Sequence, residues 1–354
     1  MKNYYVVILA GGAGTRLWPI SRRDLPKQFF KFEKYSLFQE TYQRVKNIVP
    51  KNQIYISLVK PYLKLAQKQL PEIPIANYLI EPEAKNTGPA IGLLSAYFYW
   101  KNPKSIVATI SSDHTIKKVV NFQKALRENF AFVKNNPEYL ATISVKPTRV
   151  ETGFGYIKIS KKLPFWPQYR VEKFIEKPNL KKAGLFLKSP KYLWNVSYFT
   201  WESENMLRAY QKLTPKIYQK LAKIITLLER SNSQREIDKI YQKMPSESFD
   251  KAIVEKMKKI VTNPTDLDWS DIGSFKTLSE KLSSNKKSLQ KNHLGIDNQD
   301  CFIVSSNRLL ATVGLKDIVI VDTDDVLLVC HKDKAQDVKR IYQKLQKLKK
   351  IEYL

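Results

Sequence analysis

A glycine-rich turn followed by two cationic side chains is the part of this sequence best suited to chemistry. The apolar run Tyr4–Ala10 leads into the turn 11–14, which reads GGAG, and Arg16 and Lys27 come soon after it. Glycine lacks a Cβ, so the backbone N–H groups of such a turn can approach phosphate oxygens closely. Amides aimed at an anion, together with fixed cations, form a polyphosphate site. The pattern therefore predicts a nucleotide ligand.

Two better-known phosphate loops do not fit this turn. The Walker loop ends in Gly-Lys-Ser/Thr, whereas Gly14 is followed here by Thr15 and Arg16. The dinucleotide-binding fingerprint needs a third glycine or alanine at the position that Leu17 occupies. For the Gly-Gly-x-Gly pattern taken alone, a tight strand-to-helix turn without a ligand stays an alternative.

A carboxylate follows another apolar run. Asp113 comes shortly after the strand-like run Ser105–Ile110. Ligands of parallel α/β sheets bind outside the carboxyl ends of the strands, so this side chain is expected at the ligand edge. A helix N-cap for the following segment is the alternative interpretation. A softer metal is disfavoured, because the sequence shows no HxxxH or CxxC pattern.

The residues beyond the glycine turn extend it into a longer signature. Leu17-Trp18-Pro19 and Pro26-Lys27-Gln28-Phe29 follow the turn in order. With these motifs the chain resembles the sugar-nucleotide pyrophosphorylases, and among them the mannose-1-phosphate guanylyltransferases, or GDP-mannose pyrophosphorylases. The resemblance is strong from Tyr4 to about Ser274 and weaker beyond. It implies that GTP and α-D-mannose 1-phosphate are the substrates, and GDP-mannose and diphosphate the products.

The resemblance also implies the mechanism and the residues that serve it. Transfer is expected to be in line and to need Mg²⁺ but no general base, because a phosphate nucleophile is already ionised near neutral pH. The implied catalytic residues are Arg16, Lys27, Asp113 and Asp271, with Asp113 and Asp271 as the magnesium ligands. The implied nucleotide-binding residues are Gly11, Gly12, Gly14, Thr15, Arg16, Lys27, Glu81, Asn86, Thr87, Gly88 and Asp113. The implied sugar-phosphate-binding residues are Gly155, Glu176, Lys177 and Asn195.

Two positions depart from the family pattern. Most relatives have alanine where Gly88 stands, in the segment implied to receive the base. Val196 and Ser197 replace a Ser-Gly pair after Asn195, and we expect two bulkier side chains at a sugar-facing turn. Because of these departures, the sequence leaves open which sugar and which base the protein binds. Another sugar-1-phosphate nucleotidyltransferase and a non-catalytic regulatory homologue that binds sugar nucleotides therefore stay as alternatives.

Composition narrows the class of protein. The chain has 354 residues, of which 43% are hydrophobic, and it carries a net charge of +28 from 61 Lys and Arg against 33 Asp and Glu. The lysines are scattered, which favours a solvated basic surface over a nucleic-acid interface. No apolar run approaches the roughly 20 residues that span a bilayer. Two cysteines without a CxxC pattern indicate a reducing compartment, so we expect a cytoplasmic protein. We expect no membrane partner and no nucleic-acid partner. The oligomeric state stays open, with a homodimer through the C-terminal unit as one alternative.

The elements that must position these residues alternate between strand and helix. Strand-like runs are expected at Tyr4–Ala10, Ile54–Val59, Ala76–Ile80, Ser105–Ile110 and Tyr139–Val145, with helices at Leu37–Ile48, Tyr62–Leu70, Pro89–Tyr99 and Phe122–Val133. This alternation predicts an α/β fold, a Rossmann-like nucleotidyltransferase domain with a mostly parallel sheet. From Glu151 to about Thr262 the pattern is mixed, with strand-like pieces at Gly155–Ile159 and Val171–Ile175 and a helical stretch at Glu204–Leu228.

The C-terminal part differs in pattern. Short strands are expected at Cys301–Ser305, Leu309–Val313, Ile318–Asp322 and Val326–Cys330, followed by an amphipathic helix at about Ala335–Leu348. Their spacing suits a small β-rich unit that resembles a few coils of β-helix. The expected domains are a catalytic domain at 1–278, a linker at 279–291, and the small β unit with its terminal helix at 292–354.

Overall fold

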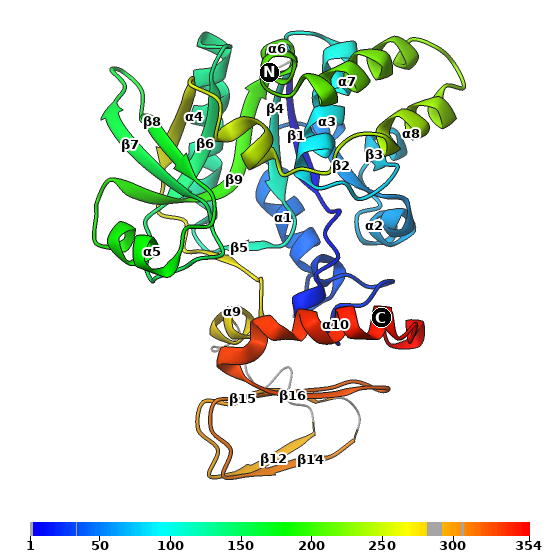
Figure 1. Ribbon diagram of the computed structural model, residues 1–354, viewed down its shortest axis with the longest axis vertical. Helices are drawn as coiled ribbons and strands as arrows, with labels where there is room; N and C mark the ends of the chain where they lie inside the picture. The colour runs from blue at the N-terminus through cyan, green and yellow to red at the C-terminus, as the bar shows by residue number, and fades with distance from the viewer. Residues whose placement is uncertain (1–2, 33, 282–291, 306–307) are drawn as a thin grey trace. The chain divides into compact units, whose positions relative to one another are not determined.

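The computed structural model describes residues 3–32, 34–281, 292–305 and 308–354 (Figure 1). The chain forms two compact units, each built from separate pieces of sequence. Unit 1 consists of Met1–Gly11, Tyr42–Ser111 and Ile116–Trp269. Unit 2 consists of Gly12–Thr41, Ser112–Thr115 and Ser270–Leu354. The segment 12–30, which we call the phosphate loop after its predicted role, thus belongs to the same unit as the C-terminal residues. The sequence patterns did not predict this grouping.

Unit 1 is built on a nine-stranded sheet in the order β3-β2-β1-β4-β9-β6-β10-β8-β7. Every strand of this sheet runs in one direction except β8 and β9, as the parallel and antiparallel pairings require, so the expected mostly parallel sheet is confirmed. The strands are β1 Tyr4–Leu9, β2 Ile54–Val59, β3 Tyr78–Glu81, β4 Ile106–Ser111, β6 Leu140–Val145, β7 Tyr156–Lys162, β8 Tyr169–Ile175, β9 Tyr192–Glu202 and β10 Ile260–Pro264.

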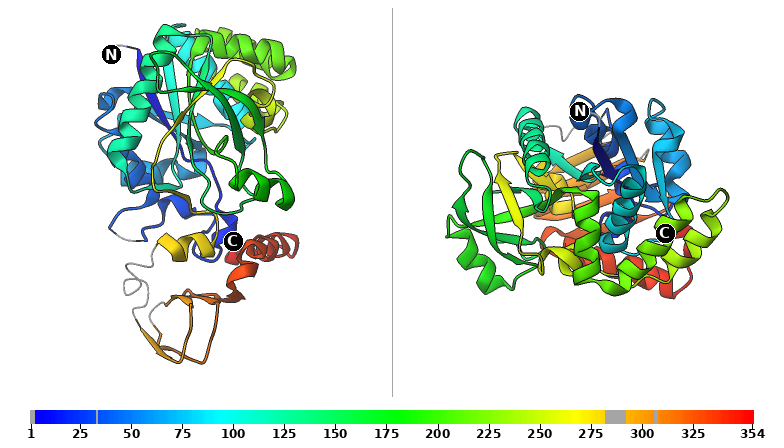
Figure 2. Two further views of the ribbon diagram at one scale, coloured as in Figure 1. Left: turned by 90° about the vertical axis from the view of Figure 1, so that its left-hand side faces the viewer. Right: turned by 90° about the horizontal axis from the view of Figure 1, so that it is seen from above.

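Helices cover both faces of this sheet. Seen from above, α4 lies on one side of it and α6 and α7 lie on the other (Figure 2). The helices between β1 and β10 are α1 Leu37–Val45, α2 Leu63–Gln69, α3 Thr87–Lys101, α4 Val119–Asn135, α5 Leu180–Leu187, α6 Ser203–Leu213, α7 Pro215–Leu228 and α8 Gln234–Gln242. None of the described helices is long and apolar enough to cross a membrane.

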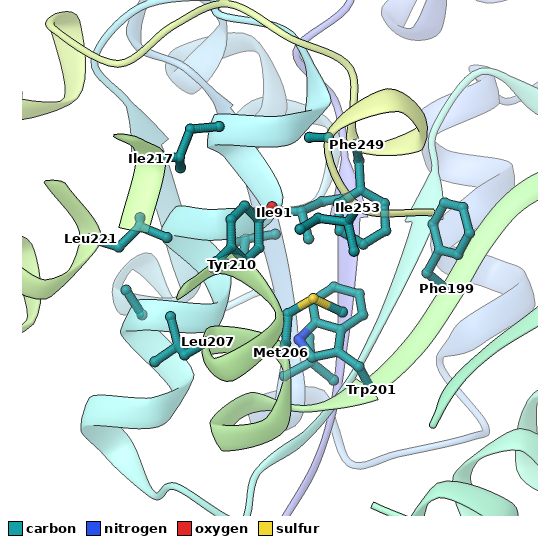
Figure 3. Packing of buried hydrophobic residues seen from close by; sticks show 14 of the residues in the cluster. Ile91, Phe199, Trp201, Met206, Leu207, Tyr210, Ile217, Leu221, Phe249 and Ile253 are labelled. Carbon is teal, nitrogen blue, oxygen red and sulfur yellow. The ribbon is translucent and has the colours of Figure 1, made fainter. Parts of the chain in front are cut away.

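The core of unit 1 lies where α3, α6 and α7 meet the sheet (Figure 3). Tyr210, Phe249 and Trp201 are almost completely buried there. Phe249 stacks edge-on against Phe199 of β9, with 5.0 Å between the ring centroids. A π-helical turn at Asp250–Val254 directly follows Phe249, so the core also fixes that turn.

Two features of unit 1 differ from what the sequence analysis described. The helical stretch Glu204–Leu228 is two helices, because Pro215 begins α7 at its first position and lacks the N–H that would continue α6. Strand β9 was not predicted at all. Its residues are mostly buried on both faces, so it lacks the period-2 alternation that identifies a half-exposed strand.

Unit 2 contains the small β structure and its own core. Its C-terminal elements are α9 Phe275–Lys281, β12 His293–Ile296, β13 Phe302–Val304, β14 Leu310–Val313, β15 Ile318–Asp322, β16 Leu327–His331 and α10 Val338–Lys347. Strands β12 and β14 pair in parallel, as do β13 and β15, which is the arrangement of stacked coils. The expected β-rich unit ending in a helix is confirmed.

The core of unit 2 joins the phosphate-loop segment to these C-terminal elements. Leu17 and Ile20 share one buried cluster with Phe275, Phe302 and Val321. The expected linker at 279–291 falls largely outside the described residues, and its first three residues form the end of α9. The division at 278 and 292 therefore stays a prediction.

Candidate active site

A buried lysine between two carboxylates is the centre of the site in unit 2. The Nζ atom of Lys27 lies 2.9 Å from Oδ2 of Asp113 and 3.9 Å from Oδ1 of Asp271. It also donates a hydrogen bond of 2.8 Å to the carbonyl oxygen of Ile272. Three of the four expected catalytic residues thus meet around one ammonium group, although they are far apart in sequence.

The charges of this cluster shift one another's pKa. Burial alone would lower the pKa of Lys27, but the negative charges of Asp113 and Asp271 outweigh burial and raise it. Burial would raise the pKa of Asp113, but Lys27 and then His114 hold it well below its usual range. Lys27 is therefore a cation and Asp113 an anion at neutral pH.

The local chain geometry explains how Lys27 reaches this place. Lys27 begins a short 3₁₀ turn after Pro26, and its backbone N–H donates to Oγ of Ser21. Gly14 has a positive φ of 62°. A Cβ at Gly14 would lie 2.7 Å from both Cγ of Lys27 and Oγ of Ser21. Only glycine fits this position without displacing Lys27.

The other residues of the phosphate loop surround this lysine. Gln28 donates a hydrogen bond of 2.9 Å to the carbonyl oxygen of Gly12. Thr15 and Arg16 form the 3₁₀ turn that follows Gly14. Arg16 is exposed, and its positive charge acts to lower the pKa of Lys27. The positive charge of Arg16 thus reaches Lys27, although the two aspartates affect the pKa of Lys27 more strongly.

The two carboxylates fit a hard divalent cation. The described residues contain no group of three or more His, Cys, Asp or Glu side chains that could hold a metal alone. Asp113 and Asp271 nevertheless face a common point, since both lie within 4.0 Å of Nζ of Lys27. Mg²⁺ is usually held by one or two carboxylates together with substrate phosphates and water. This donor set suits Mg²⁺ once a phosphate is present.

Asp113 is not a helix N-cap. The residues after it form the short strand β5, His114–Ile116, which pairs with β11, Trp269–Asp271. This pairing is what brings the two acidic residues together, because Asp113 immediately precedes β5 and Asp271 ends β11. Neither strand was predicted, since three residues are too few to show a periodic pattern.

The expected base-binding residues lie in unit 1, at the end of β3 and the start of α3. Glu81 is buried and accepts a hydrogen bond of 2.8 Å from Oγ of Ser57. Burial raises the pKa of Glu81, although Ser57 and Tyr241 partly counteract it. A Cβ at Gly11 would lie 3.7 Å from Oε1 of Glu81, so this carboxylate borders the start of the glycine turn.

Asn86 caps helix α3. Its side chain accepts a hydrogen bond from the backbone N–H of Thr87, and its φ is 70°. The hydroxyl of Thr87 in turn accepts from the backbone N–H of Phe249. The cap places Asn86 and Thr87 at the start of α3, next to the end of β3.

The expected sugar-phosphate residues gather around the end of β8 and the middle of β9. A Cβ at Gly155 would lie 3.0 Å from Oε2 of Glu176, so glycine lets these two approach. Lys177 has a positive φ of 45° and pairs with Glu176 at 2.6 Å. Asn195 on β9 donates to Oδ1 of Asp250 at 3.2 Å.

The structure differs from our expectation that Val196 and Ser197 lie at a sugar-facing turn. Val196 is completely buried within β9 and does not form a sugar-facing turn. Ser197 has a positive φ of 57°, and its backbone N–H donates to Oδ1 of Asn195. Because glycine adopts this conformation without strain, the left-handed backbone explains why a glycine suits position 197.

Comparisons with known proteins identify the family of this chain. Residues 5–288 match the family described as nucleotidyl transferase, and residues 291–345 match the MannoseP isomerase/GMP-like beta-helix domain. The mannose-1-phosphate guanylyltransferase RfbM of Salmonella typhimurium is 34% identical over 362 residues, which cover 99% of this chain and 74% of that protein. This chain belongs to the nucleotidyl transferase family.

Further matches extend the likeness over nearly the whole nucleotidyltransferase. A mannose-1-phosphate guanylyltransferase of Escherichia coli is 32% identical, with 96% of this chain and 75% of that protein covered. The crystal structure of the mannose-1-phosphate geranyltransferase from Thermus thermophilus matches with a TM-score of 0.85 at 25% identity. That match covers 97% of this chain and 99% of the other. The expected family, fold and enzyme class are confirmed.

Asp250 is a candidate site residue of this nucleotidyltransferase that our sequence analysis missed. It begins the π-helical turn after Phe249 and contacts Asn195. Burial, and next the negative charge of Glu176, raise its pKa to about 7. The sequence contains one signal that could have identified Asp250, namely a carboxylate within an apolar stretch that reads FDKAIV at 249–254. A buried, charge-perturbed acid next to a substrate site is typical of functional residues.

The raised pKa of Asp250 predicts a pH-dependent penalty on stability. Between its ordinary value of 3.8 and about 7, the folded protein keeps a proton that the unfolded chain has lost. Stability contributed by this group therefore falls as pH rises through that window. We expect Asp250→Asn to gain nothing in Tm at pH 4 and several degrees at pH 8, where a pKa raised from 3.8 to about 7 corresponds to about 4 kcal/mol.

Thermal unfolding of wild type and Asp250→Asn from pH 4 to pH 8 measures this difference. Glu236→Gln is the matched control, because Glu236 is exposed on α8. A Tm difference that stays constant with pH would contradict the shifted pKa of Asp250.

Gly88 has a packing role of its own in this chain. A Cβ at Gly88 would lie 2.5 Å from the carbonyl oxygen of Glu247, and the N–H of Gly88 donates to that same oxygen. Gly88→Ala must therefore displace backbone, and we expect a loss of about 1–3 kcal/mol in unfolding free energy.

Gly184→Ala on α5 is the control for this prediction. Because the space around its added Cβ is open, the unfolding free energy should rise by about 0.5–1 kcal/mol. Chemical denaturation measures both, and equal effects would refute the packing argument.

Proposed function

We propose that this nucleotidyltransferase joins GTP and mannose 1-phosphate to form GDP-mannose and diphosphate. The observation that carries the proposal is the Lys27 cluster, in which a buried cation and two carboxylates meet beside a glycine-rich phosphate loop. The names of the relatives supply the substrates: both curated relatives described above are mannose-1-phosphate guanylyltransferases.

In the proposed reaction, a phosphate oxygen of mannose 1-phosphate attacks the α-phosphorus of GTP. A new P–O bond forms as the bond from the α-phosphorus to the bridging oxygen breaks, and the β- and γ-phosphates leave as diphosphate. No general base is needed, because the attacking phosphate is already ionised. Catalysis then consists of placement and charge neutralisation.

Named residues of this chain supply those effects. Lys27 neutralises charge that builds on the α-phosphate, and Arg16 stabilises the departing diphosphate. The backbone N–H groups around Gly11, Gly12 and Gly14 bind phosphate oxygens. Lys177 holds the incoming sugar phosphate; it is 59% exposed and so can exchange Glu176 for a phosphate partner.

Asp113 and Asp271 would hold Mg²⁺ in this reaction. When bound, Mg²⁺ neutralises phosphate charge as a Lewis acid and orients the two substrates. Asp113 remains ionised well below neutral pH, as a hard-cation ligand must. Lys27 lies within ion-pair distance of both carboxylates and balances their charge.

We assign base and sugar recognition to unit 1. Glu81, as a carboxylate, accepts hydrogen bonds from the N1 and N2 edge of guanine, with Asn86, Thr87 and Gly88 forming the neighbouring helix start. Burial raises the pKa of Glu81, so two further donors from a ligand would help to keep this carboxylate ionised. Glu176 accepts hydrogen bonds from sugar hydroxyls, and the side-chain amide of Asn195 forms hydrogen bonds with them.

We also propose a homodimer that forms through the β strands of unit 2. Leu294 and Ile296 on β12 and Val313 on β14 are each more than 60% exposed, and Ile296 pairs with Val313. Alternate residues of a strand share a face, so these side chains form one exposed apolar patch.

The two cysteines are free thiols, which suits the proposed cytoplasmic location.

Light scattering after gel filtration tests the dimer. Ile296→Glu should convert a dimer to a monomer, because it places a charge in the apolar patch. Ile75→Glu is the control, since Ile75 is an exposed isoleucine of unit 1. A wild-type protein that is monomeric at micromolar concentration would refute the proposal.

Release of diphosphate with Mg²⁺, measured for four nucleoside triphosphates against mannose and glucose 1-phosphates, tests the function. Release confined to GTP with mannose 1-phosphate would support the whole proposal. Release with another pair would show a different sugar-1-phosphate nucleotidyltransferase. If no pair reacts while GTP still raises Tm, the protein is a non-catalytic homologue that binds nucleotides.

A further inference from the structure

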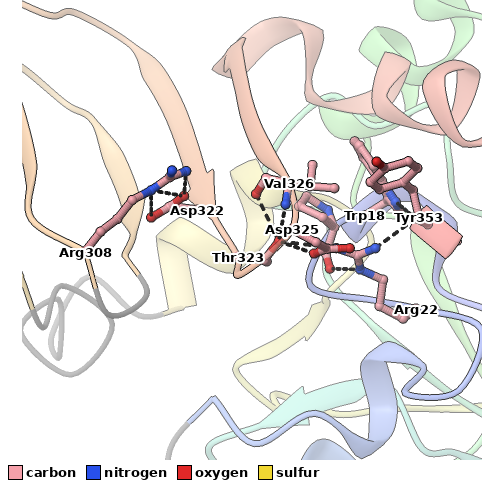
Figure 4. Close-up of polar contacts among 9 residues, drawn as sticks. Trp18, Arg22, Arg308, Asp322, Thr323, Asp325, Val326 and Tyr353 are labelled. Atoms are coloured by element: carbon pink, nitrogen blue, oxygen red, sulfur yellow. Dashed lines mark hydrogen bonds and ion pairs between the residues drawn. The ribbon is translucent and has the colours of Figure 1, made fainter.

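Arg22 connects the loop between Gly14 and Lys27 to C-terminal residues of unit 2 (Figure 4). Its Nε donates to the carbonyl oxygen of Pro19 at 2.7 Å, within the loop itself. Its Nη1 donates to the carbonyl oxygen of Tyr353 at 2.9 Å. Its Nη2 donates to Asp325 at 2.6 Å and to Thr323 at 3.2 Å. One guanidinium thus holds three separate segments of chain.

The partners of Arg22 are themselves held in place. Oγ1 of Thr323 donates to Oδ1 of Asp325 at 3.0 Å and accepts from the backbone N–H of Val326. The indole Nε1 of Trp18 donates to the carbonyl oxygen of Tyr353 at 2.6 Å, so this carbonyl receives hydrogen bonds from two loop residues. The Arg22 side chain is only 14% exposed. Asp325 is 45% exposed, so the anchor depends less on this ion pair alone than on the several hydrogen bonds that the buried guanidinium donates at once.

Arg22 also adjoins the residue that sets the position of Lys27. Oγ of Ser21 donates to the carbonyl oxygen of Ala13 at 3.0 Å and accepts from the backbone N–H of Lys27 at 3.1 Å. Ser21 therefore ties the two ends of the loop together. The backbone N–H of Arg22 donates to the carbonyl oxygen of Leu25, which closes the remaining turn before Lys27.

We propose that Arg22 is a positioning residue for nucleotidyl transfer: it anchors the phosphate loop to the turn Thr323–Val326 and to Tyr353. This inference rests on the proposed function of Lys27. It gives the C-terminal β unit a role in the reaction, because that unit supplies Thr323 and Asp325, two of the hydrogen-bond partners of Arg22. Lysine cannot replace Arg22, since a single ammonium group cannot reproduce the planar fork that reaches Pro19, Asp325 and Tyr353 together.

Loss of the anchor should affect turnover more than sugar-phosphate binding. A displacement of about 1 Å in a catalytic group can reduce rate by about a hundredfold. We expect Arg22→Ala to lower kcat between about tenfold and a hundredfold. The KM for mannose 1-phosphate should stay within about twofold, because Glu176, Lys177 and Asn195 belong to unit 1. Arg22→Lys should not restore kcat.

Arg308→Ala is the matched control. Arg308 also lies in unit 2 and also pairs with an aspartate, since its Nε contacts both carboxylate oxygens of Asp322 at 2.9 and 3.0 Å (Figure 4). Its partner lies at the end of β15 and not in the phosphate loop. If Arg22 only stabilised the fold, the two variants would lower Tm and kcat alike.

Hydrogen exchange tests the anchor without any need for activity. We expect faster exchange of the backbone amides at 12–30 in Arg22→Ala, and in a variant that lacks residues 351–354, but not in Arg308→Ala. Unchanged exchange in Arg22→Ala would overturn the proposal even if the wild type is an active enzyme. Faster exchange with an inactive wild type would uphold the anchor and refute the proposed function instead. Faster exchange with kcat unchanged in an active enzyme would refute the positioning role.

Discussion

Replacing Lys27 with methionine is expected to lower kcat by a hundredfold or more. Removal of one preorganised group that stabilises transition-state charge typically has an effect of this size. Lys27 is almost completely buried, and the carboxylates of Asp113 and Asp271 and the carbonyl of Ile272 fix its ammonium group. Methionine keeps much of the side-chain length and removes the charge, so the variant tests the charge itself.

The same change should have a smaller effect on stability. Breaking a fully buried ion pair costs about 3–5 kcal/mol. Asp113 is 30% exposed, so water can solvate part of its charge after the substitution and the loss should be smaller. The pKa of Asp113 should rise in the variant, because Lys27 is a main cause of its low value.

Steady-state kinetics with GTP and mannose 1-phosphate, together with Tm, separate these effects. Lys31→Met is the matched control: Lys31 lies four residues along the chain and is exposed. We expect that control to keep turnover within about twofold, as surface substitutions usually do. Near-normal turnover in Lys27→Met would show that Lys27 does not act on the α-phosphate.

Replacing Asp271 with asparagine is expected to lower kcat at a fixed Mg²⁺ concentration by about a hundredfold. The substitution keeps the shape of the side chain and removes one anionic ligand, and Mg²⁺ in such sites depends on one or two carboxylates. The Mg²⁺ concentration for half-maximal activity should rise, because fewer charges then hold the ion. Asp113→Asn should behave in the same way, since both carboxylates face Nζ of Lys27.

A neighbouring aspartate provides the control for this prediction. Asp268 lies three residues before Asp271, is exposed, and pairs with Lys117. Asp268→Asn should leave the Mg²⁺ requirement unchanged. Mg²⁺ titrations of activity, with Mn²⁺ binding measured directly on the same variants, test the assignment. If Asp271→Asn binds Mn²⁺ as tightly as wild type in the presence of GTP, Asp271 is not a metal ligand.

The sequence alone determined what depends on neighbours along the chain. The glycine turn, its two cations and the preceding strand were predicted. Strand β1 ends at Leu9, one residue before the end of the apolar run Tyr4–Ala10 that indicated it. Glycine conformation, strand propensity and helix capping act within a few residues, so the order of the residues is sufficient to predict them. The alternation of short apolar strands with helices likewise predicted the mostly parallel sheet.

Only the tertiary structure decided which distant residues meet. The pairing of β5 with β11 brings Asp113 to Asp271, and both strands are too short to show a pattern in sequence. Asp250 became a candidate through its contact with Asn195, and Arg22 through its contacts with Asp325 and Tyr353. Such contacts form because burial and pairing offset the entropy of closing long loops. That balance belongs to the whole fold, and no local pattern encodes it.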